Sequence, residues 1–198
     1  MLEENLRHHY QKWFVDPVAK AIQHYINPLH ITILSGLLGL LVIPTLYYSK
    51  IALALLLLVS SGYLDTLDGT VARQTKASSA FGSAMDIVTD RLVEISVVIG
   101  LWLVDPTHRA FLSLLMLASM LLCITSFLVV GIFTSNDSHK GFHYSPGIME
   151  RAEAFIFFIL MMLLPMYFVP LSILFIILVM LTTAIRLIEF RSASLSEQ

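Results

Sequence analysis

Residues 65–90 read DTLDGTVARQTKASSAFGSAMDIVTD, and the rest of the chain is best interpreted from this stretch. It holds four aspartates, Asp65, Asp68, Asp86 and Asp90, beside long apolar segments. A charged group near a bilayer core costs kilocalories unless it is paired or binds a metal. On helices, Asp65 and Asp68 (i, i+3) share one face, and Asp86 and Asp90 (i, i+4) share another. Two helices meeting at these faces would surround a small volume with carboxylates, which predicts a site for Mg²⁺, Mn²⁺ or Ca²⁺.

The rest of the chain has the composition of a membrane protein. Hydrophobic residues make up 57% of the 198 residues and charged residues 13%, and the mean hydropathy is +0.81. Apolar stretches of spanning length predict six transmembrane helices. Four are expected within 31–48, 51–71, 77–104 and 110–135, and two within 154–185, separated at Pro165 and Pro170. We therefore expect an all-α, polytopic membrane protein with a single domain over 1–198 and a six-helix bundle over 29–191.

The basic residues predict the orientation in the membrane. With the N-terminus inside, only Lys50 and Arg109 would lie outside, and every other lysine and arginine would lie at a cytoplasmic end or loop. This bias predicts that both termini are cytoplasmic and that the four aspartates lie on the cytoplasmic side. Cys123 is the single cysteine, so no disulfide is expected within the chain. A compact chain without targeting extensions favours the plasma membrane of a bacterium or archaeon.

The N-terminal residues 2–25 differ from the rest. Apolar and aromatic residues recur at helical spacing between charged and polar ones. These apolar residues are Leu2, Leu6, Tyr10, Trp13 and Phe14. The pattern predicts an amphipathic helix in the cytoplasmic interface, which Pro17 is expected to break or re-angle. A frayed polar leader is the alternative.

The small and basic residues around the aspartates indicate which kind of ligand the predicted metal site binds. Divalent cations held by carboxylates clamp phosphates. Gly69 and Gly82 would let a ligand approach the backbone closely, and Ala72 keeps the same helix face narrow. Arg73 can neutralise a phosphate or hold a carboxylate in a bidentate contact. These features together predict a bulky phosphorylated ligand that binds through metal near the cytoplasmic interface.

At its fixed positions, D-x2-D-G-x2-A-R-x8-G-x3-D-x3-D, the stretch resembles the signature of the CDP-alcohol phosphotransferases. The expected six-helix layout is also similar to that family. The resemblance implies transfer of a phosphatidyl group from CDP-diacylglycerol to a hydroxyl acceptor, with release of CMP, by a homodimer that uses Mg²⁺ or Mn²⁺, two ions per site. It implies that Asp65, Asp68 and Asp86 are metal ligands, and that Asp90 is the general base and also reaches the second metal. The nucleotide cradle would comprise Asp65, Asp68, Gly69, Ala72, Arg73 and Gly82.

The acceptor is predicted from basic residues outside the motif. Arg151 and Arg186, at the cytoplasmic ends of the fifth and sixth expected spans, suit a phosphorylated acceptor such as inositol phosphate or glycerol phosphate. Membrane anchoring by terminal basic residues is the alternative. Residues 147–153 resemble the corresponding part of phosphatidylinositol-phosphate synthases. Those enzymes carry a lysine near the end of the fourth span, where this chain has Ile132-Phe133-Thr134, and Lys140 is the candidate substitute. Serine, inositol and phosphatidylglycerol are the other acceptors considered.

Several other hypotheses follow from individual residues or compete with the enzyme. Arg91 is expected to form a structural ion pair with Glu94 or Asp68. Asn27, Pro28 and Thr32 either contact a bound cytidine or, for Asn27-Pro28, simply begin a helix. An ion-coupled transporter would place its charges near mid-membrane between repeated halves, and no repeat is visible. A lipid-binding protein without activity would not need the complete aspartate motif. No nucleic-acid partner is expected.

Overall fold

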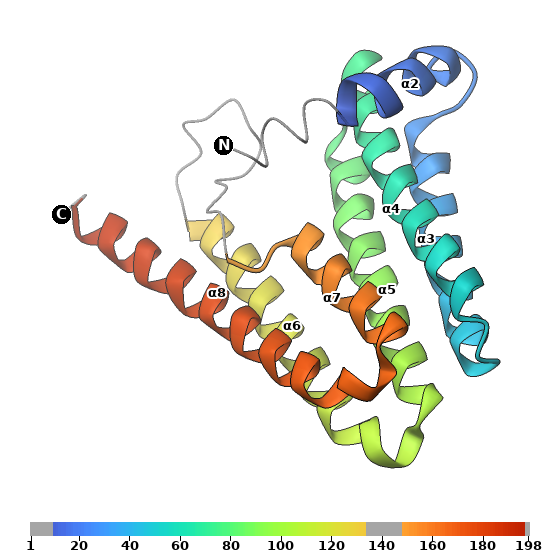
Figure 1. Cartoon of the computed structure of the whole chain (residues 1–198). Coiled ribbons are helices and arrows are strands. Elements are labelled where there is room, and N and C mark those ends of the chain that lie inside the picture. The colour runs from blue at the N-terminus through green and yellow to red at the C-terminus, as the bar shows by residue number, and fades with distance from the viewer. Residues whose placement is uncertain (1–9, 134–147, 197–198) are drawn as a thin grey trace. The chain divides into compact units, whose positions relative to one another are not determined.

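The computed structural model of the chain describes residues 10–133 and 148–196, and all regular structure in these ranges is helical (Figure 1). The all-α prediction is confirmed. The elements are η1 (Gln11–Val15), α2 (Asp16–Ile22), α3 (Pro28–Tyr47), α4 (Ile51–Gln74), α5 (Ala80–Val104), α6 (Pro106–Phe133), α7 (Arg151–Leu163), η2 (Pro165–Tyr167) and α8 (Phe168–Ser196). They form two compact units, Met1–Val104 (unit 1) and Asp105–Gln198 (unit 2), and each is described by itself. The single domain stays a prediction.

In unit 1, helix α3 packs along both α4 and α5. Glycines let α3 and α5 approach closely. A Cβ atom added to Gly39 would lie 2.5 Å from Val93 Cγ2, and one added to Gly100 would lie 2.7 Å from Leu46 Cδ1. Among the described residues no glycine has a positive φ, so small size rather than backbone freedom explains these two positions. Small residues at such interfaces are how membrane helices pack closely.

The helix ends have local causes. Asn27 Oδ1 accepts a hydrogen bond of 3.0 Å from the Leu29 amide, and Pro28 is the first residue of α3. The Asn27-Pro28 pair therefore begins a helix. In unit 2, the break between α7 and α8 falls at Leu164–Tyr167, as the proline pattern predicts, and Pro170 lies inside the first turn of α8, where a proline is tolerated.

The N-terminal segment packs against α4. Helices η1 and α2 run on from one another, and Pro17 lies in the first turn of α2, where the backbone changes from π to α geometry. The buried cluster between the segment and the helices consists of Val15, Ala19, Ile31, Leu67 and Val71. Trp13 and Phe14 are 71% and 65% exposed. Residues 2–9 lie outside the described ranges, and the location of the segment in a membrane interface stays a prediction.

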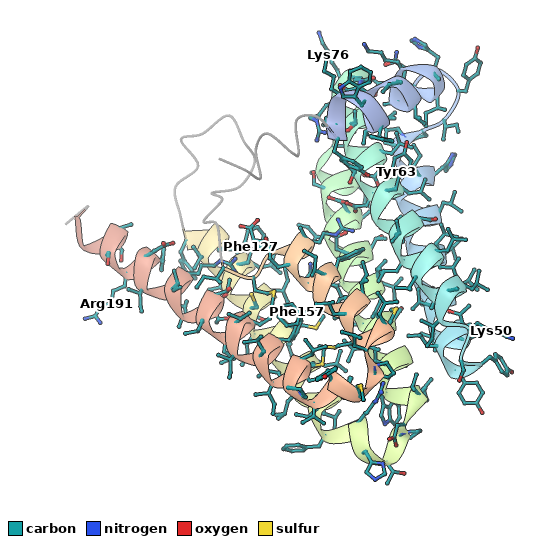
Figure 2. The ribbon with its side chains drawn as sticks, in the orientation of Figure 1. Lys50, Tyr63, Lys76, Phe127, Phe157 and Arg191 are labelled. Carbon is teal, nitrogen blue, oxygen red and sulfur yellow. The ribbon has the colours of Figure 1, made fainter. Side chains whose placement is uncertain are left out.

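Four helical segments in the described part are long and apolar enough to cross a membrane: α3, α4, α6 and Pro165–Ser194. Helix α5 is long enough at 25 residues but carries charges in its first half. Helix α7 has 13 residues, and at about 1.5 Å per residue it is shorter than a hydrocarbon core of roughly 30 Å. The count of six spans therefore stays a prediction. Figure 2 shows Lys50 and Lys76 at opposite ends of unit 1, where the chain enters and leaves α4.

Candidate functional site

Two neighbouring helices position the four aspartates of the motif. Asp65 and Asp68 lie in the second half of α4, and Asp86 and Asp90 lie in the first half of α5. One carboxylate oxygen each from Asp65, Asp68 and Asp86 can be chosen so that all three lie within 4.8 Å of one another. Among the described residues this group contains three members, and Asp90, one turn further along α5, is not one of them. The structure thus brings together three of the four aspartates as a candidate metal site.

The geometry of the three carboxylates fits a divalent cation. Oxygen ligands of Mg²⁺ lie about 2.0–2.1 Å from the ion and those of Ca²⁺ about 2.3–2.6 Å, so two oxygens on one ion are at most about 4–5 Å apart. The separation of at most 4.8 Å satisfies this limit. All the donors are oxygens, which is the chemistry that hard cations prefer. The residues present therefore fit the metal that the motif implies.

A hydroxyl from a third helix orients one of these carboxylates. Asp68 is only 5% exposed, and its Oδ2 accepts a hydrogen bond of 2.5 Å from Thr32 Oγ1 on α3. Hydrogen-bonding partners of this kind fix the orientation of a metal-binding carboxylate. From the sequence, Thr32 was a candidate for cytidine contact. The structure shows Thr32 hydrogen-bonded to Asp68, and nothing in the local sequence signals that contact because the two residues are 36 positions apart. The contact with cytidine stays a prediction.

The two glycines of the motif have more space around them than Gly39 or Gly100. A Cβ atom added to Gly69 would meet only Arg73 Nη1, at 3.3 Å, and one added to Gly82 would meet only Ser79 Oγ, at 3.1 Å. Both neighbouring atoms belong to side chains that can move. Packing among the described residues therefore does not require either glycine, and the close approach of a ligand to these positions stays a prediction.

The basic residue of the motif lies on the same part of α4. Arg73 Nη2 donates a hydrogen bond of 3.1 Å to Thr70 Oγ1, and its Nη1 is the atom nearest to the space beside Gly69. Ala72, the small residue that precedes Arg73, is half-buried. The guanidinium thus lies beside the glycine that opens the surface of the helix. A phosphate approaching Gly69 would meet a donor group suited to it.

The expected structural ion pair of Arg91 is confirmed, and its partner is Glu94 on the same helix, α5. Arg91 Nη1 lies 2.6 Å from Glu94 Oε2, and the Glu94 side chain is 4% exposed. Breaking a buried pair by removing one partner typically costs about 3–5 kcal/mol, because a buried charge is left uncompensated. Glu94 therefore contributes to the structure of α5, one turn beyond Asp90.

Unit 2 contains the two arginines considered for the acceptor. Arg186 on α8 donates from Nη1 to the Cys123 carbonyl oxygen at 3.1 Å and to Ser126 Oγ at 3.3 Å on α6. Its guanidinium carbon lies 5.2 Å from the centre of the Phe127 ring, which Figure 2 labels near the end of α6. The Arg186 side chain is thus held against a neighbouring helix of unit 2.

Arg151 is the first residue of α7, and its guanidinium carbon lies 5.6 Å from the centre of the Phe155 ring. The start of this helix is held by a capping box between Glu150 and Glu153. The third acceptor candidate, Lys140, falls in 134–147, outside the described residues.

Comparison with known proteins identifies the family of the chain. Residues 25–188 match the family described as CDP-alcohol phosphatidyltransferase, and the match runs through both units. The archaetidylinositol phosphate synthase of Methanothermobacter thermautotrophicus is 33% identical over 144 residues, which cover 72% of this chain and 68% of that protein. The phosphatidylinositol phosphate synthase of Corynebacterium glutamicum is 31% identical over 149 residues, covering 72% of this chain and 65% of that protein.

A third relative is the inner membrane protein YnjF of Escherichia coli, which is 29% identical over 150 residues, covering 72% of both chains. The family match covers far more than half of the chain and includes every residue of the aspartate motif. Together with the apolar helices, it confirms the enzyme hypothesis over the transporter. The chain belongs to the CDP-alcohol phosphatidyltransferase family and is an integral membrane transferase of phospholipid biosynthesis.

Proposed function

We propose that this enzyme transfers a phosphatidyl group from CDP-diacylglycerol to a hydroxyl of a small phosphorylated polyol and releases CMP. The observation that carries the proposal is the cluster of Asp65, Asp68 and Asp86 carboxylates in a chain of this family. Inositol phosphate is the first candidate acceptor, because two of the relatives are named as synthases of inositol phosphate lipids. Glycerol phosphate is the second.

The carboxylates of Asp65, Asp68 and Asp86 would hold a divalent cation, Mg²⁺ or Mn²⁺, and Asp90 would contribute to a second ion. When bound, such ions supply positive charge that offsets the charge of the pyrophosphate and of the leaving phosphate. Asp68 enters this arrangement already oriented by Thr32. Nearby, Gly69 leaves room for the nucleotide and Arg73 supplies a further positive charge.

Direct displacement is the simplest reaction for these residues. The acceptor oxygen would attack the phosphorus linked to the lipid, and Asp90 would take the hydroxyl proton as general base. The new phosphorus–oxygen bond forms as the bond from that phosphorus to the bridging oxygen breaks, and CMP leaves with the electron pair. The proposal assigns the motif aspartates to metal binding and proton transfer, and no other residue of the motif stands out as a covalent nucleophile, so we expect direct displacement without a covalent intermediate.

Arg151 and Arg186 would recognise the phosphate of the acceptor. A guanidinium binds phosphate with two parallel hydrogen bonds, which a neutral acceptor would not satisfy. Hydrogen bonds to Cys123 and Ser126 on α6 hold the Arg186 side chain of α8 in place, which limits the entropy lost when a ligand binds. Lys140 stays a further candidate for the same phosphate. We also propose a homodimer in a bacterial or archaeal plasma membrane, with the active site and both termini on the cytoplasmic side.

Release of CMP by the purified protein tests the proposal. The assay would contain CDP-diacylglycerol, Mg²⁺ or Mn²⁺, and one acceptor from inositol 1-phosphate, glycerol 3-phosphate, inositol, serine and phosphatidylglycerol. Metal-dependent release with inositol 1-phosphate alone is the expected result. Release with only an unphosphorylated acceptor would overturn the assignment of the acceptor class. The absence of both release and CDP-lipid binding would overturn the proposed reaction.

Arg186→Ala should weaken use of the phosphorylated acceptor. We expect its KM to rise by about ten- to a hundredfold, since hydrogen bonds to charged groups are worth about 1.5–3 kcal/mol, while the KM for CDP-diacylglycerol stays near that of the wild type. Steady-state kinetics with each substrate varied in turn separates the two values. Arg191→Ala, an exposed arginine on the same helix, is the matched control. A rise in both KM values would assign Arg186 to the structure of unit 2 instead.

Thr32→Val should weaken metal binding by changing the orientation of Asp68. Substituting a residue that orients a metal ligand typically lowers metal affinity or activity about 10–100-fold. The measurement is the Mg²⁺ or Mn²⁺ concentration that gives half-maximal CMP release. Thr45→Val is the control, because Thr45 lies on the same helix and bonds only the Leu41 and Val42 carbonyls of that helix. An unchanged metal requirement in Thr32→Val would contradict the prediction.

A further inference from the structure

The hydroxyl of Thr70 connects the N-terminal segment to the basic residue of the motif. Thr70 is buried on α4, and Gln11 Nε2 of η1 lies 2.7 Å from its Oγ1. Arg73 Nη2 lies 3.1 Å from the same oxygen, and the Thr66 carbonyl oxygen lies 2.8 Å from it. Gln11 Nε2 also lies 3.1 Å from Asp16 Oδ1. One buried oxygen thus joins the side chains of Gln11 and Arg73, and Gln11 is 59 positions from Thr70 in sequence.

The chemistry of these groups sets the direction of every bond. A carbonyl can only accept, so the single proton of the Thr70 hydroxyl goes to Thr66. The two lone pairs of that hydroxyl then accept from Gln11 and from Arg73. An ionised Asp16 can only accept as well, so the second amide hydrogen of Gln11 goes to Asp16. The orientation of the Gln11 amide therefore follows from its partners. The Thr70 hydroxyl has no donor or acceptor site left for a further hydrogen bond.

The positions on α4 show what this network controls. Successive residues of an α-helix are about 100° apart, so Asp65, Asp68, Gly69 and Ala72 share one face, and Tyr63, Leu67, Thr70 and Val71 share the opposite face. The N-terminal segment packs on the second face. Arg73 lies between the two faces, since it bonds Thr70 while its Nη1 lies beside Gly69. A change on the face of α4 that contacts the N-terminal segment can therefore affect the candidate nucleotide site through the position of Arg73.

We propose that Gln11 is a positioning residue for the nucleotide site: through the Thr70 hydroxyl it holds the Arg73 guanidinium beside Gly69. The inference rests on the proposed function, in which Arg73 contacts the CDP group of the donor lipid. Gln11 is itself held by Asp16 and by the packing of Val15 against α4. Gln11 is the first residue of a π-helix, a rare geometry that often marks functional positions.

Steady-state kinetics of variants at Gln11, Thr70 and Arg73 test the positioning role of Gln11. Gln11→Leu and Thr70→Val remove the two ends of the Gln11–Thr70 bond. Each should raise the KM for CDP-diacylglycerol about three- to tenfold, the size expected for one neutral hydrogen bond, with kcat within about twofold of wild type. Thr70→Ser keeps the hydroxyl and should restore the wild-type KM. In an Arg73→Ala background, Gln11→Leu should add no further effect, because the positioned group is gone.

A second tether of the same segment supplies the control. Tyr63 OH donates to the Phe14 carbonyl oxygen at 3.0 Å, so it also joins the segment to α4 but is not one of the hydrogen-bond partners of the Thr70 hydroxyl described above. Tyr63→Phe should therefore keep the wild-type KM. An equal rise in Tyr63→Phe would overturn the positioning role and show that docking of the segment in general is required.

Calorimetric titration of the wild-type protein with CDP and Mg²⁺ separates failure of this inference from failure of the proposed function. A wild-type protein that neither binds CDP nor releases CMP would refute the proposed function. A wild-type protein that does both, with Gln11→Leu and Thr70→Val indistinguishable from it, would refute the role of Gln11 alone.

Discussion

Asp90→Asn is expected to abolish turnover while binding of the CDP-lipid stays largely intact. Among the described residues, the oxygens that fit one cation come from Asp65, Asp68 and Asp86, and Asp90 lies outside that group. An asparagine at position 90 keeps the size of the side chain but cannot take the acceptor proton. General-base catalysis typically contributes about 10²–10⁴-fold, so kcat should fall by that factor.

Two measurements on the same preparations decide the role of Asp90. CMP release gives kcat, and titration with CDP-diacylglycerol gives the affinity for the donor. Asp86→Asn removes a member of the carboxylate group and should lose both activity and affinity. Asp105→Asn, at a half-buried position outside the motif, should resemble wild type. Equal loss of turnover and of binding in Asp90→Asn would show that Asp90 is chiefly a ligand and not the base.

Gly39→Ala is expected to destabilise unit 1, whereas Gly69→Ala should leave its stability unchanged. The added Cβ atom at position 39 would lie 2.5 Å from Val93 Cγ2 and 3.0 Å from two further atoms of that valine, so α3 and α5 must move apart. Overpacking of this kind typically costs about 1–3 kcal/mol. At position 69 the added atom would meet only the movable end of Arg73.

Thermal unfolding in detergent measures the stability of both variants, and titration with CDP-diacylglycerol measures how Gly69→Ala affects donor binding. One kcal/mol shifts the melting temperature of a chain of this length by roughly 2–4 °C, so Gly39→Ala should melt about 2–12 °C lower. Gly69→Ala should melt with the wild type but bind CDP-diacylglycerol more weakly, because its methyl group would occupy the space proposed for the ligand. A normal melting temperature for Gly39→Ala would contradict the tight contact between the helices.

Much of the fold follows from local patterns in the chain. Uncharged runs of spanning length predict α3 and α6 to within a few residues, and an apolar run with Asp65 and Asp68 near one end predicts α4, because an apolar run and a breaking residue are each visible without tertiary contacts. Asn27-Pro28 and Pro165 mark helix boundaries for the same reason. Helix α7 agrees less well with a spanning segment, since the break at Leu164 leaves it only 13 residues.

The aspartate motif can also be recognised from the sequence without knowledge of tertiary contacts. Its spacing places Asp65 with Asp68, and Asp86 with Asp90, on common helix faces, and the short connection between α4 and α5 brings the two pairs together. The structure then distinguishes residues that are alike in the sequence. Asp90 separates from the three carboxylates that fit one ion, and Gly39 and Gly69 have opposite surroundings. These differences depend on how the helices pack against one another, because the packing sets the neighbours of each helix face.

The sequence by itself determined the helices, the membrane class, the family and the identity of the candidate ligands, because periodicity, apolar runs and motif spacing act within about thirty residues of chain. Only the tertiary structure decided that Thr32 orients Asp68, that Gln11 reaches Arg73 through Thr70, and that Arg186 bonds to α6. These contacts join residues 36 to 63 positions apart. A side chain's partner at that separation is set by the packing of whole helices, which no local pattern encodes.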